Sequence, residues 1–132
     1  MNNTKFVVID KSIFINVEII LPNSKEKKEV PMLLDTGARY NIIDSSLLKK
    51  LGYDLNLYHS FTFRGFGSKD LIGKEVKISS MKLHKLKRTN VSVIAYDMPL
   101  YFLQYCFGII GLDFLRNQIF TIDLKNNEFH FS

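Results

Sequence analysis

Apolar and polar residues alternate along most of the chain, a pattern typical of β-strands with one buried face. The clearest alternation covers residues 13–21, where every second side chain is Ile, Val or Leu. A short apolar strand is predicted before it, over 5–9. A Pro22-Asn23-Ser24 turn then predicts a return strand that runs to Leu34.

The alternation changes phase once, after Ser79-Ser80. Apolar side chains occupy even positions over 76–78 and odd positions over 81–83. A slip of one residue in a period-two pattern predicts a bulge or a bend at this point. Further strands are predicted over 91–95 and in a C-terminal hairpin over 120–131 with a polar turn.

Only two segments have helical character. Asp44 is suited to cap a helix over 45–51, where three leucines share one face and Gly52 follows the last turn. A second, short helix is predicted over 112–117. Strands account for the rest, so we expect one mostly antiparallel, all-β domain that spans residues 1–132.

Length and residue types narrow the class of protein. A chain of 132 residues buries an adequate core without disulfide or metal staples. The single cysteine, Cys106, excludes an intramolecular disulfide and a cysteine-based zinc site. No metal is expected, because His59, His84 and His130 lack ligand spacing. We expect a cytoplasmic protein away from membranes, since no apolar run has spanning length and residues 1–5 do not begin a secretory signal.

The charge is basic, with eighteen Lys and Arg against thirteen Asp and Glu and a net charge of +5. Such an excess raises binding of nucleic acid as a hypothesis. The lysines of 25–28 are mixed with glutamates at a predicted hairpin tip, and the basic cluster over 82–88 contains no Phe, Tyr or Trp. We therefore favour solvated surface and expect no nucleic-acid partner.

Candidate chemistry is concentrated where an apolar strand runs directly into Asp35-Thr36-Gly37-Ala38, with apolar residues resuming at Ile42. A carboxylate at the end of a buried strand is costly unless it is hydrogen-bonded. Thr36 supplies a hydroxyl, and Gly37 lets a backbone amide approach the carboxylate closely. An ordinary β-turn is the alternative, and the apolar flanks on both sides favour a built site.

A second motif lies near the C-terminal end, where residues 108–117 read Gly-Ile-Ile-Gly-Leu-Asp-Phe-Leu-Arg-Asn. Together with Leu33-Leu34-Asp35-Thr36-Gly37-Ala38, this segment closely resembles the retropepsin-like aspartic proteases, especially their cellular and bacterial members. The resemblance covers about residues 12–131 and implies an all-β half-barrel with one or two short helices.

The resemblance implies hydrolysis of peptide bonds by two facing aspartates, which share one proton and activate a water molecule. No aspartate other than Asp35 is followed by Thr-Gly or Ser-Gly. We therefore expect a homodimer that acts on polypeptides with Asp35 of each subunit, without a metal or an organic cofactor. In the family, the residue at Thr36 bonds across the two-fold axis, while Gly37 and Ala38 shape the loop and the cleft floor.

The resemblance also implies a set of substrate-binding residues. It places a mobile flap over 61–69, for which an ordinary hairpin with aromatic side chains in the core is an equal alternative. The expected substrate contacts from the flap, the catalytic loop and the segment that crosses beside it are Phe63, Gly65, Phe66, Gly67, Ala38, Arg39, Ile109 and Ile110.

Two departures from the viral members keep other hypotheses open. Arg39 stands where an acidic residue is common, and it either favours ionisation of Asp35, selects acidic substrate residues or pairs with the partner subunit. Leu112 replaces an arginine that follows Gly111 in viral members, which leaves the usual inter-subunit support open. A catalytically silent dimerisation or peptide-binding module is therefore the second hypothesis, and a basic β-barrel that binds nucleic acid is the third.

The segment 97–107 is unusually aromatic for a connection. We expect it to lie mainly in the core, with a substrate pocket and the dimer interface as alternatives. Cys106 is expected to be a buried, unreactive thiol, because no histidine partner is evident.

Overall fold

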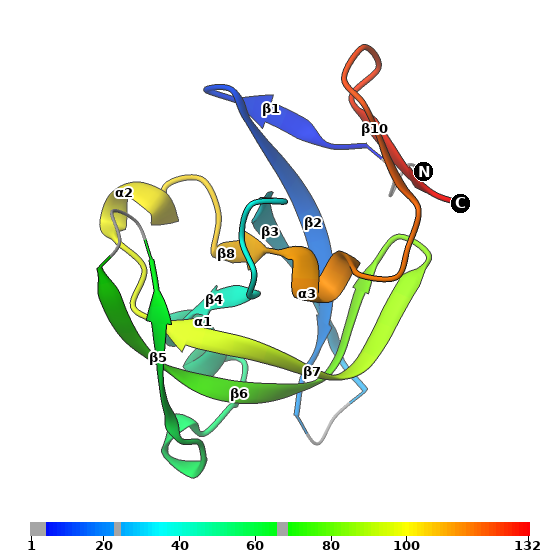
Figure 1. Ribbon diagram of the computed structural model, residues 1–132. Coiled ribbons are helices and arrows are strands. Elements are labelled where there is room, and N and C mark those ends of the chain that lie inside the picture. Colours follow the sequence, from blue (N-terminus) through cyan, green and yellow to red (C-terminus); the bar gives the residue numbers. More distant parts are fainter. Residues whose placement is uncertain (1–4, 23–24, 66–68) are drawn as a thin grey trace.

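Strands make up most of the structure, as the alternation predicts. The computed structural model describes residues 5–22, 25–65 and 69–132. The strands are β1 Val7–Ile9, β2 Ser12–Ile20, β3 Lys27–Leu34, β4 Ile42–Asp44, β5 Ser60–Arg64, β6 Asp70–Leu83, β7 Leu86–Tyr96, β8 Gly108–Ile110, β9 Phe120–Asp123 and β10 Glu128–Phe131. In the described residues, eight of them form one sheet in the order β1-β2-β3-β8-β4-β7-β6-β5, and β9 pairs with β10 (Figure 1).

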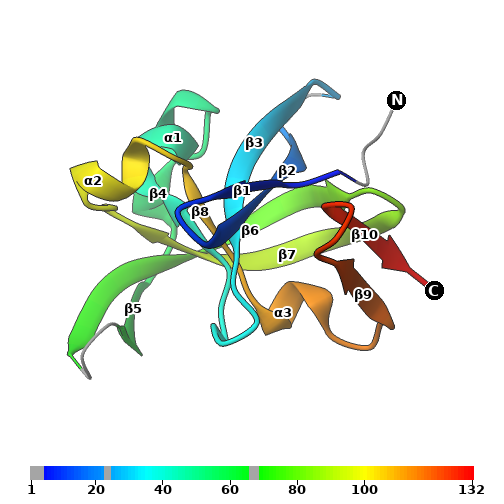
Figure 2. The same ribbon diagram turned by 90° about the horizontal axis from the view of Figure 1, so that it is seen from above.

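The sheet closes on itself because β2 pairs with β6 as well as with β3. Ile19 lies opposite Met81 across this second contact, and both side chains are fully buried. Ile15 and Val17 point to the same core, which confirms the face predicted for residues 13–21. Figure 2 shows the barrel from above, with the β9–β10 hairpin and β5 at opposite ends.

The alternation changes phase at a bend and not at a bulge. The β6–β7 ladder keeps one register on both sides of Ser79, so neither strand carries an extra residue. Opposite Ser79, Asn90 has a positive φ of 54°, a conformation that Asn adopts more readily than most residues. Beyond the bend β6 reaches β2, and Ser80 and Met81 are therefore both buried.

Two of the helices confirm the sequence prediction. Helix α1 spans Ser45–Lys50 with Asp44 as its N-cap, and α3 spans Leu112–Leu115, two residues shorter than predicted. The sequence does not predict the 3₁₀ helix Leu55–Leu57 or helix α2, Leu100–Leu103, because neither is long enough to show a helical period. None of the helices in the described residues is long and apolar enough to cross a membrane.

The aromatic segment 97–107 is less buried than expected. Met98 and Cys106 do lie in the core, but Leu100 and Tyr101 are 83% and 67% exposed. The expectation of a core segment is therefore wrong for its middle part. There the four-residue helix α2 projects from the sheet, too short to bury an apolar face (Figure 1).

Asp44 joins two segments through one buried carboxylate. Its Oδ2 accepts a hydrogen bond from the amide of Leu47 at 3.3 Å, and its Oδ1 accepts one from the amide of Met98 at 3.0 Å. We expect Asp44→Ala to lower the free energy of unfolding by about 1–3 kcal/mol, because a helix cap and a buried amide both lose their acceptor. Denaturant titration followed by circular dichroism measures the loss.

Asp54→Ala is the matched control, since Asp54 is exposed and accepts one hydrogen bond, from the amide of Asn56. We expect this variant to lose less than about 1 kcal/mol. Equal losses in the two variants would contradict the role assigned to Asp44.

Candidate active site

The chain enters and leaves the Asp35 loop on two strands that are separated by a third. Strand β8 pairs in parallel with β3 and antiparallel with β4, so that Ile109 lies between Leu33 and Ile42. The amide of Asp35 donates to the carbonyl of Ile110 at 3.0 Å. The insertion of β8 therefore determines where the loop begins and where it ends.

The carboxylate of Asp35 is oriented by its own loop. The amide of Gly37 donates to Oδ1 at 2.9 Å, and the amide of Ala38 donates to the carbonyl of Asp35 at 3.1 Å. A Cβ on residue 37 would lie 3.2 Å from Oδ1, which is why glycine suits this close approach. Asp35 is half-buried and faces a cleft, so the carboxylate is held on one side and open on the other.

Buried Asn41 fastens the far end of the loop. Its Oδ1 accepts a hydrogen bond from the amide of Gly111 at 3.1 Å, and its Nδ2 donates to the carbonyl of Ser92 at 3.4 Å. Asn41 is 1% exposed, so its amide group has to be satisfied by the protein. The sequence carries one signal for this role, a lone amide next to an apolar run, which does not by itself distinguish a buried residue from a surface one.

Helix α3 is bonded directly to the same loop. The amide of Leu112 donates to the carbonyl of Ala38 at 2.8 Å, and the amide of Asp113 donates to that of Arg39 at 3.1 Å. Gly111 lies so close that a Cβ there would collide with backbone carbonyls of the loop. The two sequence motifs therefore meet in space as one unit.

The Asp35 loop forms one wall of a cleft of about 780 Å³. The predicted site residues that line it are Asp35, Gly37, Ala38, Arg39, Phe63, Gly65 and Ile109. Phe66 and Gly67 lie outside the described residues, so their predicted contacts stay predictions.

Two predicted site residues point elsewhere. Ile110 is fully buried in the core, because neighbouring residues of a strand face opposite sides and Ile109 takes the cleft side. This corrects the expectation that Ile110 contacts the substrate. Thr36 is exposed on the loop and is absent from the described lining of the cleft.

The β5–β6 hairpin forms the opposite wall of the cleft. The amide of Gly65 donates to the carbonyl of Lys69 at 3.0 Å near its tip. Phe63 is 5% exposed and packs edge-on against Tyr96, with ring centroids 5.5 Å apart. Phe63 lines the cleft as well, so one residue is both packed in the protein and placed at the cleft; the mobile flap stays a prediction.

Sequence reasoning misses most of the remaining wall. Tyr40, for example, packs edge-on against Phe61 with ring centroids 5.3 Å apart and thereby connects the Asp35 loop to the hairpin. The further lining residues are Ile42, Thr62, Arg64, Leu71, Tyr96, Met98 and Pro99. They come from strands and loops that are distant in the sequence, so no local pattern assigns them to one site.

The charges around the cleft are mainly positive. Arg39 and Arg64 line it together with Asp35. Arg39 is exposed, its guanidinium lies 6.0 Å from the ring centre of Tyr40, and in the described residues it forms no ion pair with Asp35. The Nε of Arg64 lies 3.8 Å from Oδ1 of Asp70. Within the same residues, no three His, Cys, Asp or Glu side chains gather as metal ligands.

A closed β-barrel with an Asp-Thr-Gly loop fixed by an inserted strand is the architecture of aspartic proteases of the retropepsin type. The family model described as "gag-polyprotein putative aspartyl protease" matches residues 23–117. The fold is similar to that of a retropepsin-like aspartic protease from Rickettsia conorii, with a TM-score of 0.68 and 18% identity over 95% of this chain and 86% of that one. No curated protein matches the sequence. The chain belongs to the retropepsin-like aspartic protease family.

Cys106 is a buried thiol that is not among the described residues lining the Asp35 cleft. It is 1% exposed, and its S–H donates to the carbonyl of Gly108 at 3.6 Å. Burial raises the pKa of the Cys106 thiol above its ordinary value of 9.0. The thiolate, which is the reactive form, is therefore suppressed in the folded protein.

We expect iodoacetamide to alkylate Cys106 at least about a hundredfold more slowly in the folded protein than in denaturant. Because the pKa is raised, the rate in the folded protein stays low as the pH increases to the ordinary thiol value. Mass spectrometry of timed samples follows the modification. Rapid alkylation of the folded protein at neutral pH would contradict the buried assignment.

Proposed function

We propose that this protein is an aspartic endopeptidase whose active form is a homodimer, with Asp35 of each subunit as the catalytic pair. The observation that carries the proposal is the Asp35 carboxylate, which is bound by the Gly37 amide and open to the cleft. One chain supplies a single carboxylate of this kind, and the chemistry requires two.

In the proposed dimer the two carboxylates face each other and hold a water molecule between them. Two like charges at short range do not both ionise at low cost, so the pair shares one proton. The water oxygen attacks the scissile carbonyl carbon while the ionised carboxylate accepts a proton from that water. The protonated carboxyl group donates its proton to the carbonyl oxygen. The C–N bond then breaks, and the leaving nitrogen takes up a proton. No metal or organic cofactor takes part.

The surface around the loop supports a second copy. Thr36 is exposed beside Asp35, where its hydroxyl suits a hydrogen bond to the partner. Leu112 follows Gly111 directly and is 50% exposed although it is bonded through its amide to Ala38. An apolar side chain at this position suits burial against the partner and replaces the arginine of viral members.

The cleft supports a polypeptide substrate. Gly65, Phe63 and Ile109 provide mainly apolar surface, and Arg39 provides a positive charge at one end of the Asp35 loop. We therefore assign substrate contacts to Ala38, Arg39, Phe63, Gly65 and Ile109, and the contacts expected from the sequence for Phe66 and Gly67 stay predictions.

Asp35→Asn is expected to abolish cleavage of a mixed peptide library, with a loss of at least about a thousandfold, because an amide neither shares the proton nor accepts one from water. Its Oδ1 still accepts the Gly37 amide, so stability should be unchanged. Liquid chromatography with mass spectrometry detects the products, and Asp54→Asn is the matched control for loss of one exposed carboxylate.

A mixture of wild-type and Asp35→Asn chains tests whether both aspartates of a dimer are required. An equal mixture of wild-type and Asp35→Asn chains should retain about a quarter of the wild-type activity after exchange, because only dimers with two aspartates are competent. Activity of about half would indicate independent chains. Undiminished cleavage by Asp35→Asn alone would overturn the proposal.

Leu112→Glu is expected to weaken the dimer by at least about tenfold in Kd and to make specific activity fall on dilution, because it places a charge in the proposed interface. Analytical ultracentrifugation over a concentration series measures the dimer. Leu57→Glu is the control, since Leu57 is 75% exposed and lies in the short helix after α1. The same dimer affinity in both variants would remove Leu112 from the interface.

A catalytically silent dimer that binds peptides is the second candidate. Arg39 and Leu112 favour it, because both depart from viral members of the family. It predicts that the wild-type protein and Asp35→Asn bind peptides equally and that neither cleaves them over a wide pH range.

A further inference from the structure

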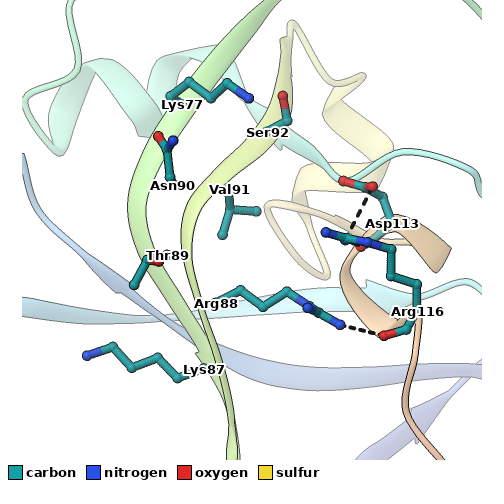
Figure 3. A pocket seen from close by; sticks show the side chains of 9 residues that line it. All are labelled: Lys77, Lys87, Arg88, Thr89, Asn90, Val91, Ser92, Asp113 and Arg116. Atoms are coloured by element: carbon teal, nitrogen blue, oxygen red, sulfur yellow. Dashed lines mark hydrogen bonds and ion pairs between the residues drawn. The ribbon is translucent and has the colours of Figure 1, made fainter.

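A second cleft, of about 480 Å³, shares no lining residue with the Asp35 cleft. Its floor is β7 from Lys87 to Ser92, with Lys77 contributed by the neighbouring strand β6. Helix α3 and the residue after it close one side with Asp113 and Arg116 (Figure 3). The volume lies within the range of about 300–1,000 Å³ that is typical of ligand pockets.

The cleft has a strong excess of positive charge. Four cationic residues and one carboxylate, that of Asp113, are among the described residues that line it. Oδ1 of Asp113 lies 3.4 Å from Nη1 of Arg116. Lys77 and Lys87 form no ion pair within the described residues, and both are exposed. The cleft therefore presents uncompensated charge to a ligand.

Arg88 is held rigidly at the centre of this charge. Its Nε donates to the carbonyl of Phe114 at 2.6 Å, and its Nη2 donates to the carbonyl of Arg116 at 2.5 Å. These bonds bring the guanidiniums of Arg88 and Arg116 to the same side of the cleft (Figure 3). Burial lowers the pKa of Arg88, and the positive charge of Arg116 lowers it further. A bound anion would relieve this repulsion between the two arginines.

We propose that this cleft binds an acidic segment of a polypeptide. Beyond the cations, Thr89, Asn90 and Ser92 supply hydroxyl and amide groups that suit carboxylates. Among the residues that the structure describes, no Phe, Tyr or Trp lines the cleft, whereas single-stranded nucleic acid is usually held by stacking on such rings. The composition of the lining therefore favours an acidic peptide over nucleic acid.

The position of the cleft gives the binding a role. Ser92 accepts the Asn41 hydrogen bond with its carbonyl, and Asp113 donates to Arg39 through its amide, so both are bonded to the catalytic loop. A polypeptide whose acidic segment occupies the cleft is thereby held on the same domain as the proposed active site, which raises its local concentration there. This role of the cleft rests on the proposed function. It predicts that the substrates carry an acidic stretch away from the peptide bond that is cleaved.

Fluorescence anisotropy with fluorescein-labelled hexaglutamate tests the binding, in the Asp35→Asn background so that the probe is not consumed. We expect Lys77→Glu/Lys87→Glu to raise the Kd at least about tenfold, since both lysines are among the four cationic residues that line the cleft and both are exposed. Lys11→Glu/Lys125→Glu is the matched control, because both lysines are exposed, line neither cleft and give the same net charge. This control should change the Kd less than about twofold.

Asp113→Asn provides a test with the opposite sign. It releases Arg116 from its carboxylate and should tighten hexaglutamate binding about three- to tenfold, whereas damage to the fold would weaken it. Equal weakening by the two double variants would overturn the proposal in favour of net charge. Tighter binding of hexathymidylate, lost in Lys77→Glu/Lys87→Glu alone, would overturn it in favour of nucleic acid.

The two proposals fail in different ways. Binding that depends on Lys77 and Lys87, together with a wild-type protein that cleaves nothing, supports the acidic site and refutes the protease. Asp35-dependent cleavage, together with hexaglutamate binding that is unaffected by the two lysines, supports the protease and overturns the acidic site.

Discussion

The insertion of β8 between β3 and β4 is the constraint on which the rest of the structure depends. It separates the strand that leads into Asp35 from the strand that leads away, so the loop between them has to span a third strand. Backbone hydrogen bonds from β8 and α3 then hold the loop at Asp35, Ala38 and Arg39. Gly111 is part of the same constraint, since a side chain there would displace the loop carbonyls.

Polar groups at the crossing are satisfied by one side chain. Asn41 is buried and bonds both Gly111 and Ser92, so one side-chain amide links the Asp35 loop to the residue after β8 and to β7. A buried amide without partners costs about 1–3 kcal/mol, so the arrangement in which both groups of Asn41 are bonded is favoured over others. The Asp35 loop is thereby tied to neighbouring strands by hydrogen bonds, an arrangement that suits the positioning role proposed for its carboxylate.

The chain holds one of the two carboxylates that the proposed chemistry requires. The described residues of β2, β3, β6 and β7 contribute to one hydrophobic core. Among the described residues, Asp35 is the one carboxylate that lines the Asp35 cleft, Arg39 and Arg64 line it as well, and exposed apolar Leu112 is bonded through its amide to the loop. The basic excess is likewise uneven, because four cationic residues line the second cleft, whereas the exposed lysines near 25–28 line neither cleft and Lys27 pairs with Glu18.

Local patterns predict the elements that depend on near neighbours. The faces of β2, the cap of α1 at Asp44 and the carboxylate of Asp35 with its Gly37 amide are all determined within a few residues. Features that depend on distant partners are not predictable in this way. The core position of Ile110 follows from its pairing with Leu34, and the exposure of Leu100 follows from a helix that projects from the sheet.

The sequence by itself therefore determined the class of fold and the position of the Asp-Thr-Gly motif on which the proposed chemistry rests, because alternation and a tripeptide motif are local properties of the chain. Only the tertiary structure decided which side chains share the cleft with Asp35 and that Asn41 holds the loop, because these residues come from strands far apart in the sequence. The tertiary structure also decided that Arg88 donates a hydrogen bond to the carbonyl of Arg116, because no local pattern in either segment predicts how β7 packs against the end of α3.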